Sequence, residues 1–263
     1  LQLGGDDPNL LADAARLALD WGYDEINLNV GCPSQRVQAG NFGACLMADP
    51  DLVARCVEAM GQASALPVTV KHRIGIDELD NDTLLTAFVD RVAEAGAQRF
   101  SVHARKAWLE GLDPKQNRTI PPLQHDRVVA LKQRRPELLI ELNGGLETPA
   151  DCLVALDECD GAMVGRAAYA HPLRWADMDH LIYGEAPRQL LASDVVEGLI
   201  PHAAQHLHRG GRLWDLCRHL VQLVEGVPGA RYWRRELGER SQRKGADLKI
   251  LEEAGRQLKD AGL

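Results

Sequence analysis

Hydrophobic and polar positions alternate over several short stretches of the first 165 residues, and this pattern predicts β-strands. The clearest stretch is 26–30, where Ile26, Leu28 and Val30 would face one side of a strand and Asn27 and Asn29 the other. Buried strands rarely carry two amides on one face unless something polar lies between them. Further strands are expected at 1–4, 67–73, 99–105, 138–143 and 161–164.

Between these strands, apolar residues recur at the spacing of amphipathic helices. Asp7 and Pro8 are typical of an N-cap and a first helical residue, and Asp49-Pro50 has the same form. Helices are expected from Pro8 to about Trp21, from Pro50 to about Met60, and at 81–95, 125–134 and 148–157. Residues 35–48 are rich in small side chains and are predicted to be a long loop, which in such a position is usually functional.

Strands that alternate with helices in units of about 30 residues predict a parallel sheet with crossover helices. A closed barrel of this type needs eight units, whereas this pattern shows six and begins within a strand. We therefore expect an α/β fold, a TIM (β/α)8 barrel whose first two units lie upstream of residue 1.

Strand patterns stop near residue 187, and the remaining residues have the spacing of helices only. We expect helices at 193–208, 213–225, 229–243 and 247–261, separated by glycine-containing breaks. The chain is thus predicted to have two domains, a barrel at 1–186 and a small helical bundle at 187–263.

Charge is distributed unevenly between the two predicted domains. The chain has a net charge of −8, but residues 187–263 hold 13 Lys and Arg against 10 Asp and Glu, a net +3. Residues 1–186 hold 17 against 28, a net −11. A basic helical region on an acidic body can still bind a polyanion locally.

The six cysteines contain no C-x-x-C pair, which indicates reduced thiols and no zinc ribbon. His202, His206 and His208 lack a supporting carboxylate motif, so we expect no metal. No apolar run approaches the length that crosses a membrane. We expect a cytoplasmic monomer without a membrane partner.

Polar or glycine residues stand at the end of every predicted strand, and the carboxyl ends of barrel strands are where such folds place their chemistry. Cys32 lies on a turn after the strand 26–30, although a buried turn cysteine is the alternative. The other strand ends carry Gln2, Asn29, Lys71 with Arg73, His103 with Arg105, Asn143-Gly144-Gly145 and Gly165-Arg166.

The last two of these strand ends suggest a phosphate site. Glycines allow backbone N–H groups to approach a phosphate, and Arg166 would add charge-assisted hydrogen bonds. A phosphate there, with a Gln, a Lys and a His on neighbouring strands, suits FMN, and Lys71 would stabilise negative charge on the reduced ring. Taken singly, Gly144-Gly145 can be an ordinary turn, Lys71 a barrel-end lysine and His103 a core histidine.

Several longer motifs resemble the tRNA-dihydrouridine synthases. They are LQLGG (1–5), NLNVGCPS (27–34), GACLM (43–47), VKHRIG (70–75), VHARKAWLEGLDPKQNR (102–118), NGG (143–145) and VGR (164–166). The loop at 103–118 resembles the A-type branch, which modifies uridines 20 and 20a in the D-loop of tRNA. The resemblance implies an FMN-bearing barrel and a helical tRNA-binding domain, with NADPH as reductant and hydride transfer from the flavin to C6 of uridine.

The resemblance also implies roles for individual residues. Cys32 matches the residue that donates a proton to C5 of the uracil, and Asn29 a nearby tRNA contact. FMN contacts are implied for Gln2, Lys71, His103, Asn143, Gly144, Gly145, Gly165 and Arg166. Contacts to tRNA are implied for Lys115, Arg118, Arg231 and Arg234.

The segment from Arg231 to Arg235 independently suggests RNA binding, because it interleaves guanidinium groups with Tyr232 and Trp233. The alternative is a solvated helix with Trp233 in the core. A uracil must leave its stack to reach a flavin, and the 35–48 loop with Phe42 is a candidate to close over it.

Two other functions remain open from the residues themselves. One is an FMN barrel that acts on a free pyrimidine or another small enone, which the basic helical region disfavours. The other is a tRNA-binding protein without catalysis, which the presence of Cys32, Lys71 and His103 disfavours.

Overall fold

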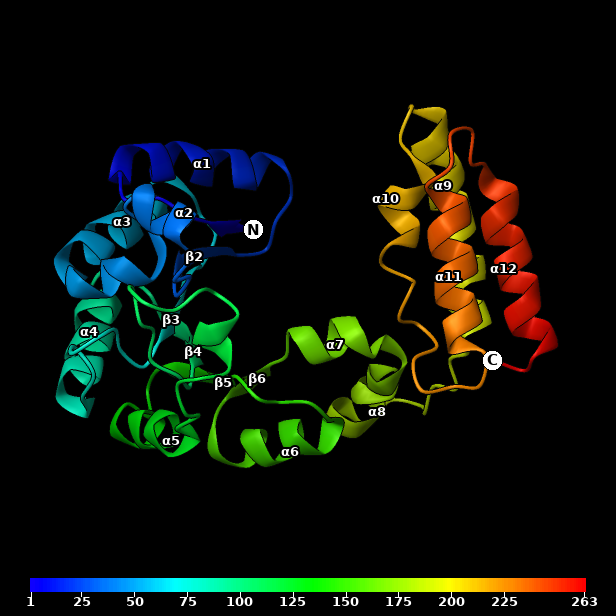
Figure 1. The fold of residues 1–263 in the computed structure, drawn as a ribbon. Helices are drawn as coiled ribbons and strands as arrows, with labels where there is room; N and C mark the ends of the chain where they lie inside the picture. The colour runs from blue at the N-terminus through cyan, green and yellow to red at the C-terminus, as the bar shows by residue number, and fades with distance from the viewer. The chain divides into compact units, whose positions relative to one another are not determined.

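The computed structural model describes residues 1–263, which divide into two units. The first comprises residues 1–146 and 151–164, and the second comprises residues 147–150 and 165–263. Figure 1 shows the elements of both along the chain. The predicted boundary at 186/187 falls inside the second unit, which begins its continuous part at Gly165.

A six-stranded parallel sheet forms the centre of the first unit, and its strand order is the order of the chain. This confirms the predicted α/β fold with parallel strands. The strands are β1 (Gln2–Leu3), β2 (Ile26–Val30), β3 (Val68–Arg73), β4 (Arg99–His103), β5 (Leu139–Asn143) and β6 (Gly161–Met163).

Helices connect consecutive strands, and their starts follow the local signals in the sequence. The Asp7 carboxylate accepts the N–H groups of Asn9 and Leu10 at the start of α1, while Asp49 and Asn81 cap α3 and α4. The helices are α1 (Pro8–Asp20), α2 (Gln35–Ala39), α3 (Pro50–Ala63), α4 (Asp82–Glu94), α5 (His125–Arg134) and α6 (Pro149–Glu158), with 3-10 turns η1 (Gly43–Ala48) and η2 (Gln116–Arg118).

The prediction of a long loop at 35–48 was wrong, because α2 and η1 occupy most of it. The Ser34 hydroxyl accepts the N–H of Val37 and starts α2. Asn41 and Gly43 then take positive φ angles of 52° and 79°, which turn the chain into η1. The small residues thus make compact turns instead of an extended loop.

The core of the first unit lies between the sheet and its helices. Helices α1, α3, α4 and α5 follow one another around the sheet, each against the next (Figure 1). The strands contribute fully buried Ile26, Leu28, Val70, Phe100 and Val102 to this core.

The inner face of α1 is narrower than the pattern suggested. Leu11, Ala15 and Ala18 are buried, whereas Leu10 and Leu17, which are apolar too, are 68% and 59% exposed. The spacing of apolar residues therefore predicts the helix correctly but overestimates how many of its side chains are buried.

The second unit is helical. Its elements are α7 (Arg166–Ala170), η3 (Pro172–Trp175), α8 (Met178–Tyr183), α9 (Ala192–His208), α10 (Leu213–Cys217), α11 (Ala230–Ser241) and α12 (Leu248–Asp260). Helices α9 to α12 share one hydrophobic core that includes Val196, Leu213, Trp233, Leu237 and Leu251. The short elements α7, η3 and α8 were not predicted. None of the helices is long and apolar enough to cross a membrane.

The predicted helix at 213–225 ends at Cys217. The following residues form successive turns, yet Leu220, Leu223 and Val224 still enter the core. The Leu220 carbonyl oxygen accepts the Leu223 N–H at 3.0 Å, which closes one of these turns, and also the Trp233 indole N–H at 2.9 Å.

Candidate functional site

The strand register places polar residues in rows on one face of the sheet. Asn29 pairs with Lys71, Lys71 with Ser101, and Ser101 with Glu141. One step toward the carboxyl ends, Arg73 pairs with His103 and His103 with Asn143. Because strand residues alternate between faces, these rows lie opposite the apolar core.

Cys32 lies on the turn directly after β2, and its backbone is held on both sides. The Asn29 Oδ1 atom accepts the N–H groups of Gly31 at 3.1 Å and Cys32 at 3.2 Å. The Cys32 carbonyl oxygen accepts the Ala44 N–H at 2.9 Å. Its thiol is half-buried and lies 3.6 Å from the Ser34 hydroxyl oxygen.

Gly43 allows η1 to approach this turn closely. A Cβ atom at Gly43 would lie 2.6 Å from the Cys32 carbonyl oxygen and 2.4 Å from Val37 Cγ1, and the φ angle of +79° also favours glycine. The segment 35–48 therefore packs closely against the turn that carries Cys32, which we call the thiol turn.

Lys71 extends from β3 toward the end of β5. Its Nζ donates to Asn143 Oδ1 at 2.9 Å, and Asn143 Nδ2 donates to the Met163 carbonyl oxygen at 2.7 Å. Burial, with a smaller contribution from nearby Arg73, lowers the pKa of Lys71 to about 8 against the opposing effects of Cys32 and Glu141. The lysine is thus close to the thiol turn and stays mainly protonated at neutral pH.

Arg73 is a site residue to which sequence reasoning assigned no role. Its Nε donates to the Gly31 carbonyl oxygen at 3.0 Å, and one terminal nitrogen donates to the carbonyl oxygens of Lys106 and Asn117, each at 3.0 Å. Burial lowers its pKa to about 10. One buried guanidinium therefore joins the thiol turn to the loop at 106–118. The only signal in the sequence was an arginine at the end of a buried strand.

The loop at 106–118 carries Lys115 and Arg118, two of the predicted tRNA contacts. Lys115 is exposed, and Arg118 is half-buried in η2 with an Nε atom that is buried and has no hydrogen-bond partner. The charges of Arg105 and Arg118 both lower the pKa of Arg73, so these guanidinium groups lie near each other. The loop therefore brings positive charge to the surroundings of Cys32.

Gly144 and Gly145 form the turn after β5, with φ angles of +107° and +74°. A Cβ at Gly144 would lie 3.2 Å from His103 Nε2, and one at Gly145 would lie 2.4 Å from Leu123 Cδ1. His125 Nε2 lies 2.7 Å from the Gly144 carbonyl oxygen. The backbone here adopts a conformation that suits only glycine, directly beside His103.

The remaining predicted cofactor contacts lie at the two ends of the strand series. Gln2, on the edge strand β1, donates from Nε2 to Asn27 Oδ1 at 2.8 Å. Gly165 and Arg166 follow β6 closely in the chain, are exposed, and belong to the second unit.

Helix α11 presents the arginines that the sequence singled out. Arg231, Arg234 and Arg235 are exposed, as is Tyr232, and the Arg235 guanidinium lies 5.6 Å from the centre of the Tyr232 ring. Trp233 is buried in the core of the second unit. The alternative interpretation was thus right for the tryptophan, and the helix still exposes three cations.

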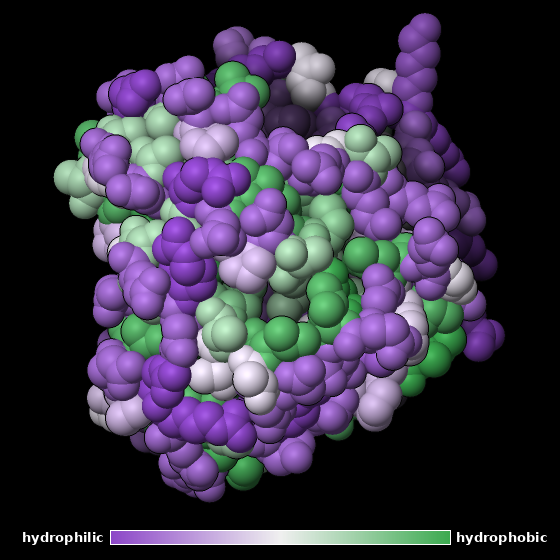
Figure 2. Space-filling model, turned by 90° about the vertical axis from the view of Figure 1, so that its left-hand side faces the viewer, coloured by the Kyte–Doolittle hydropathy of each residue, from purple (hydrophilic) through white to green (hydrophobic).

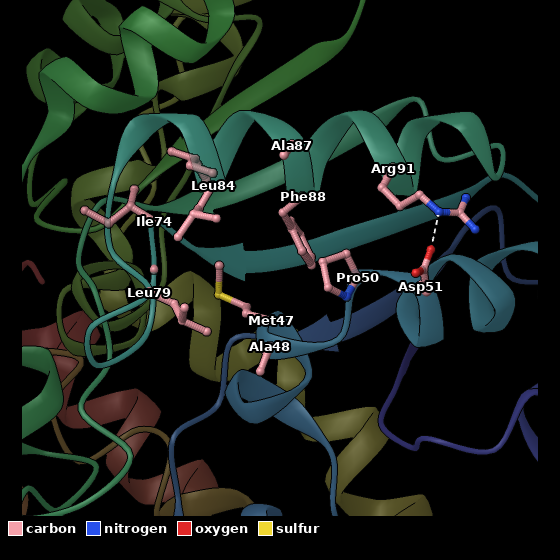
Figure 3. Close-up of a pocket in the computed structure, with 12 residues that line it drawn as sticks. Met47, Ala48, Pro50, Asp51, Ile74, Leu79, Leu84, Ala87, Phe88 and Arg91 are labelled. Atoms are coloured by element: carbon pink, nitrogen blue, oxygen red, sulfur yellow. Dashed lines mark hydrogen bonds and ion pairs between the residues drawn. The ribbon is translucent and has the colours of Figure 1, made fainter.

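A separate cavity of about 350 Å³ lies between α3, α4 and the segment after β3. Figure 2 shows apolar side chains gathered in the middle of one face of the molecule. Figure 3 shows the apolar lining of the cavity, with Met47, Ile74 and Phe88 among its residues and the Arg91–Asp51 ion pair of 2.5 Å at one end. None of the predicted site residues lines it. No group of three or more His, Cys, Asp or Glu side chains is arranged to hold a metal ion.

These features define a class of protein: an α/β protein whose polar and ionisable side chains gather at the carboxyl ends of its parallel strands. A half-buried thiol, a half-buried lysine and a glycine turn beside a histidine are brought together there from β2, β3, β4 and β5.

Comparison with known proteins gives the particular family. The family described as dihydrouridine synthase (Dus) matches residues 1–260. The chain is 52% identical, over all of its 263 residues, to a tRNA-dihydrouridine(20/20a) synthase of Synechocystis sp., of which it covers 79%. It is 51% identical over 251 residues to the protein of that name from Shewanella oneidensis, covering 95% of this chain and 75% of that protein. The chain belongs to the dihydrouridine synthase family.

Proposed function

We propose that this protein reduces uridine to 5,6-dihydrouridine at positions 20 and 20a in the D-loop of tRNA, using FMN with NADPH as reductant. The observation that carries the proposal is the convergence of Cys32, Lys71 and Asn143 at the carboxyl ends of the sheet. Family membership and about 50% identity to proteins named tRNA-dihydrouridine(20/20a) synthase support the reaction and its positions.

The residues of the first unit fit FMN. Lys71 offers a cation in a partly dry site, where it would favour negative charge on the ring. The turn at Gly144 and Gly145 has φ angles that suit glycine and lies beside His103, as expected of a backbone that approaches a phosphate-bearing ligand closely. Gln2 and Asn143 add amides. When bound, FMN supplies the hydride that goes to C6 of the uracil.

Two further FMN contacts rest on the resemblance alone. Gly165 and Arg166 match phosphate-binding positions of the family, and an arginine beside a glycine suits that ligand chemically.

Cys32 is proposed as the general acid. Addition of a hydride at C6 and a proton at C5 converts the C5–C6 double bond of uracil into a single bond, so the enzyme must supply one proton. The thiol sits on a turn held by three backbone hydrogen bonds, two to Asn29 and one from Ala44. These bonds fix the turn that carries the sulfur, while the thiol itself lies within 3.6 Å of the Ser34 hydroxyl oxygen, to which it can donate.

The proposed tRNA contacts come from both units. Asn29 uses only Oδ1 to hold the thiol turn, which leaves its Nδ2 group for the substrate. Lys115 and Arg118 lie on the loop that Arg73 ties to this turn. Arg231 and Arg234 are exposed on α11, where guanidinium groups suit RNA phosphates and bases.

We also propose the wider organisation that goes with this function. The parallel sheet would be part of a TIM (β/α)8 barrel that binds FMN, because its strand order equals its chain order. Helices α9 to α12 would form the tRNA-binding domain. The protein would act as a cytoplasmic monomer that needs no metal.

The test is reduction of unmodified tRNA by the purified protein with FMN and NADPH, followed by mapping of dihydrouridine by mass spectrometry. We expect dihydrouridine at positions 20 and 20a only. Modification at other positions would contradict the site assignment. Reduction of free uridine with tRNA left unchanged would favour a small-molecule reductase.

The roles of Arg231 and Arg234 are tested by the salt dependence of tRNA binding. Each change to Gln should lower the slope of log K against log salt by roughly 0.7–0.9 if the arginine contacts a phosphate. Arg16→Gln is the matched control, because Arg16 is an exposed helical arginine paired with Asp13. Equal slopes for all variants would place the RNA elsewhere. Fluorescence anisotropy at several salt concentrations provides the measurement.

A further inference from the structure

A line of hydrogen-bonded side chains crosses the polar face of the sheet behind Gln2. Gln2 Nε2 donates to Asn27 Oδ1, Asn27 Nδ2 donates to Thr69 Oγ1, and each distance is 2.8 Å. The Thr69 hydroxyl donates to Glu25 Oε1, also at 2.8 Å. The strand register places Gln2 opposite Asn27 and Asn27 opposite Thr69, so the side chains follow one row.

The direction of these hydrogen bonds is set at the Glu25 end. The Glu25 carboxylate accepts from Arg99 at 2.8 Å, and an ionised carboxylate can only accept. The Thr69 hydroxyl must therefore donate its single proton to Glu25, and its oxygen accepts from the donor group of Asn27. The carbonyl oxygen of Asn27 then faces Gln2, and only the NH₂ group of Gln2 can satisfy it.

This direction decides what Gln2 offers to a ligand. Its NH₂ group is turned toward Asn27, so its carbonyl Oε1 is directed away from the row and free to accept. Thr69 is 4% exposed, so the middle of the row is dry and its hydrogen bonds resist exchange with water. Without the row, the Gln2 amide could rotate by 180° and present either group.

We propose that Glu25, Thr69 and Asn27 are positioning residues that orient the Gln2 amide so that its carbonyl oxygen accepts an N–H group of the cofactor. The imide N–H of the flavin ring is the donor of that chemical class. The inference rests on the proposed FMN-dependent function. Gln2 would contact one edge of the flavin ring, and the three residues behind it would orient Gln2 without touching the ring.

The test measures FMN binding to the apoprotein by quenching of flavin fluorescence. Thr69→Val removes the hydroxyl with little change in volume and should weaken FMN binding about five-fold, the effect of one hydrogen bond. Thr69→Ser keeps the hydroxyl and should restore wild-type affinity. Thr86→Val is the control, because the Thr86 hydroxyl bonds only within its own helix.

A double-mutant cycle with Gln2→Ala separates positioning from a general effect on structure. In the Gln2→Ala background, Thr69→Val should have no further effect on FMN affinity. An equal loss in both backgrounds, or no loss from Thr69→Val alone, would overturn the inference. A wild-type protein that does not bind FMN would overturn the proposed function and this inference together, whereas normal FMN binding by Thr69→Val would overturn the inference only.

Discussion

The two faces of the parallel sheet differ in composition and in what they contribute. The face toward the helices carries Val70, Phe100 and Val102, all fully buried. The opposite face carries Lys71, which follows Val70, and Ser101, which lies between Phe100 and Val102. Both side chains form hydrogen bonds to side chains of β5. Alternate residues of a strand point in opposite directions. The same strands therefore contribute apolar side chains to the core on one face and polar side chains to the candidate site on the other.

Lys71 and His72 show the contrast at neighbouring positions. His72 is fully buried on the helix-facing side, with its ring 5.0 Å from that of Phe88 and its Nδ1 2.7 Å from the Arg73 carbonyl oxygen. Lys71 points to the opposite side and reaches Asn143. Burial lowers the pKa of both, to about 8 for the lysine and about 4 for the histidine.

The largest expected effect is on catalysis at the polar face. Cys32→Ala should lower the turnover number by roughly 10²–10⁴-fold, the usual contribution of a general acid, while FMN and tRNA affinity stay near wild type. Single-turnover reduction of tRNA by the prereduced protein measures the chemical step directly. Unchanged turnover would refute the acid role.

Cys45→Ala is the matched control for that variant. Cys45 is also a half-buried thiol, it lies in η1, and its Sγ lies 3.2 Å from the Phe42 carbonyl oxygen. We expect its turnover to remain within a small factor of wild type.

On the apolar face, Phe100→Ala should lower the free energy of unfolding by about 3–5 kcal/mol, because it leaves a cavity in the core. Ser101→Ala, at the next position on the polar face, removes a hydrogen bond to the Glu141 carboxylate and should cost less, about 1.5–3 kcal/mol. Urea denaturation of both variants measures the difference. Equal losses would mean that the two faces contribute alike to stability.

His72 should make the protein sensitive to acid. Its folded pKa of about 4 lies below the ordinary value near 6.5, so the unfolded chain binds the extra proton between these values. Stability is therefore lost as the pH falls from 6.5 to 4, by about 3 kcal/mol at most. His72→Phe should remove this part of the pH dependence of the unfolding free energy. An identical acid profile for variant and wild type would contradict the assignment.

Lys71 should affect the free energy of unfolding at alkaline pH. Its effect should be weaker than that of His72, because its side chain is only partly buried. Its folded pKa of about 8 lies below the ordinary value near 10.4, so the unfolded chain holds the extra proton between pH 8 and 10.4. Stability of wild type should thus rise relative to Lys71→Met as the pH increases through this range. The difference in unfolding free energy between the two proteins, measured at several pH values, checks this sign.

Most elements of the first unit could be predicted because their signals are local. The caps at Asp7, Asp49 and Asn81 and the alternation in β2 depend on residues a few positions apart. The errors at 35–48 and 213–225 concern segments of short turns, which have no regular hydrophobic spacing to reveal them. Contacts to other segments accompany these turns: the Cys32 carbonyl oxygen accepts the Ala44 N–H, and the Trp233 indole N–H donates to the Leu220 carbonyl oxygen.

The candidate site divides in the same way. Cys32, Lys71 and the glycine turn after β5 could be named from motifs at strand ends, whereas Arg73 could not be given a role. Its three carbonyl partners belong to a turn and a loop 33 to 44 residues away, and no local pattern marks such a contact.

The sequence by itself determined the strand–helix alternation, the position of the thiol on a turn and the family, because each depends on short runs of residues. Only the tertiary structure decided that Lys71 meets Asn143, 72 residues away, and that Glu25 governs Gln2 through Thr69 and Asn27. The physical reason is that hydrogen-bond direction and burial depend on which strands become neighbours, and that is set only when the sheet assembles.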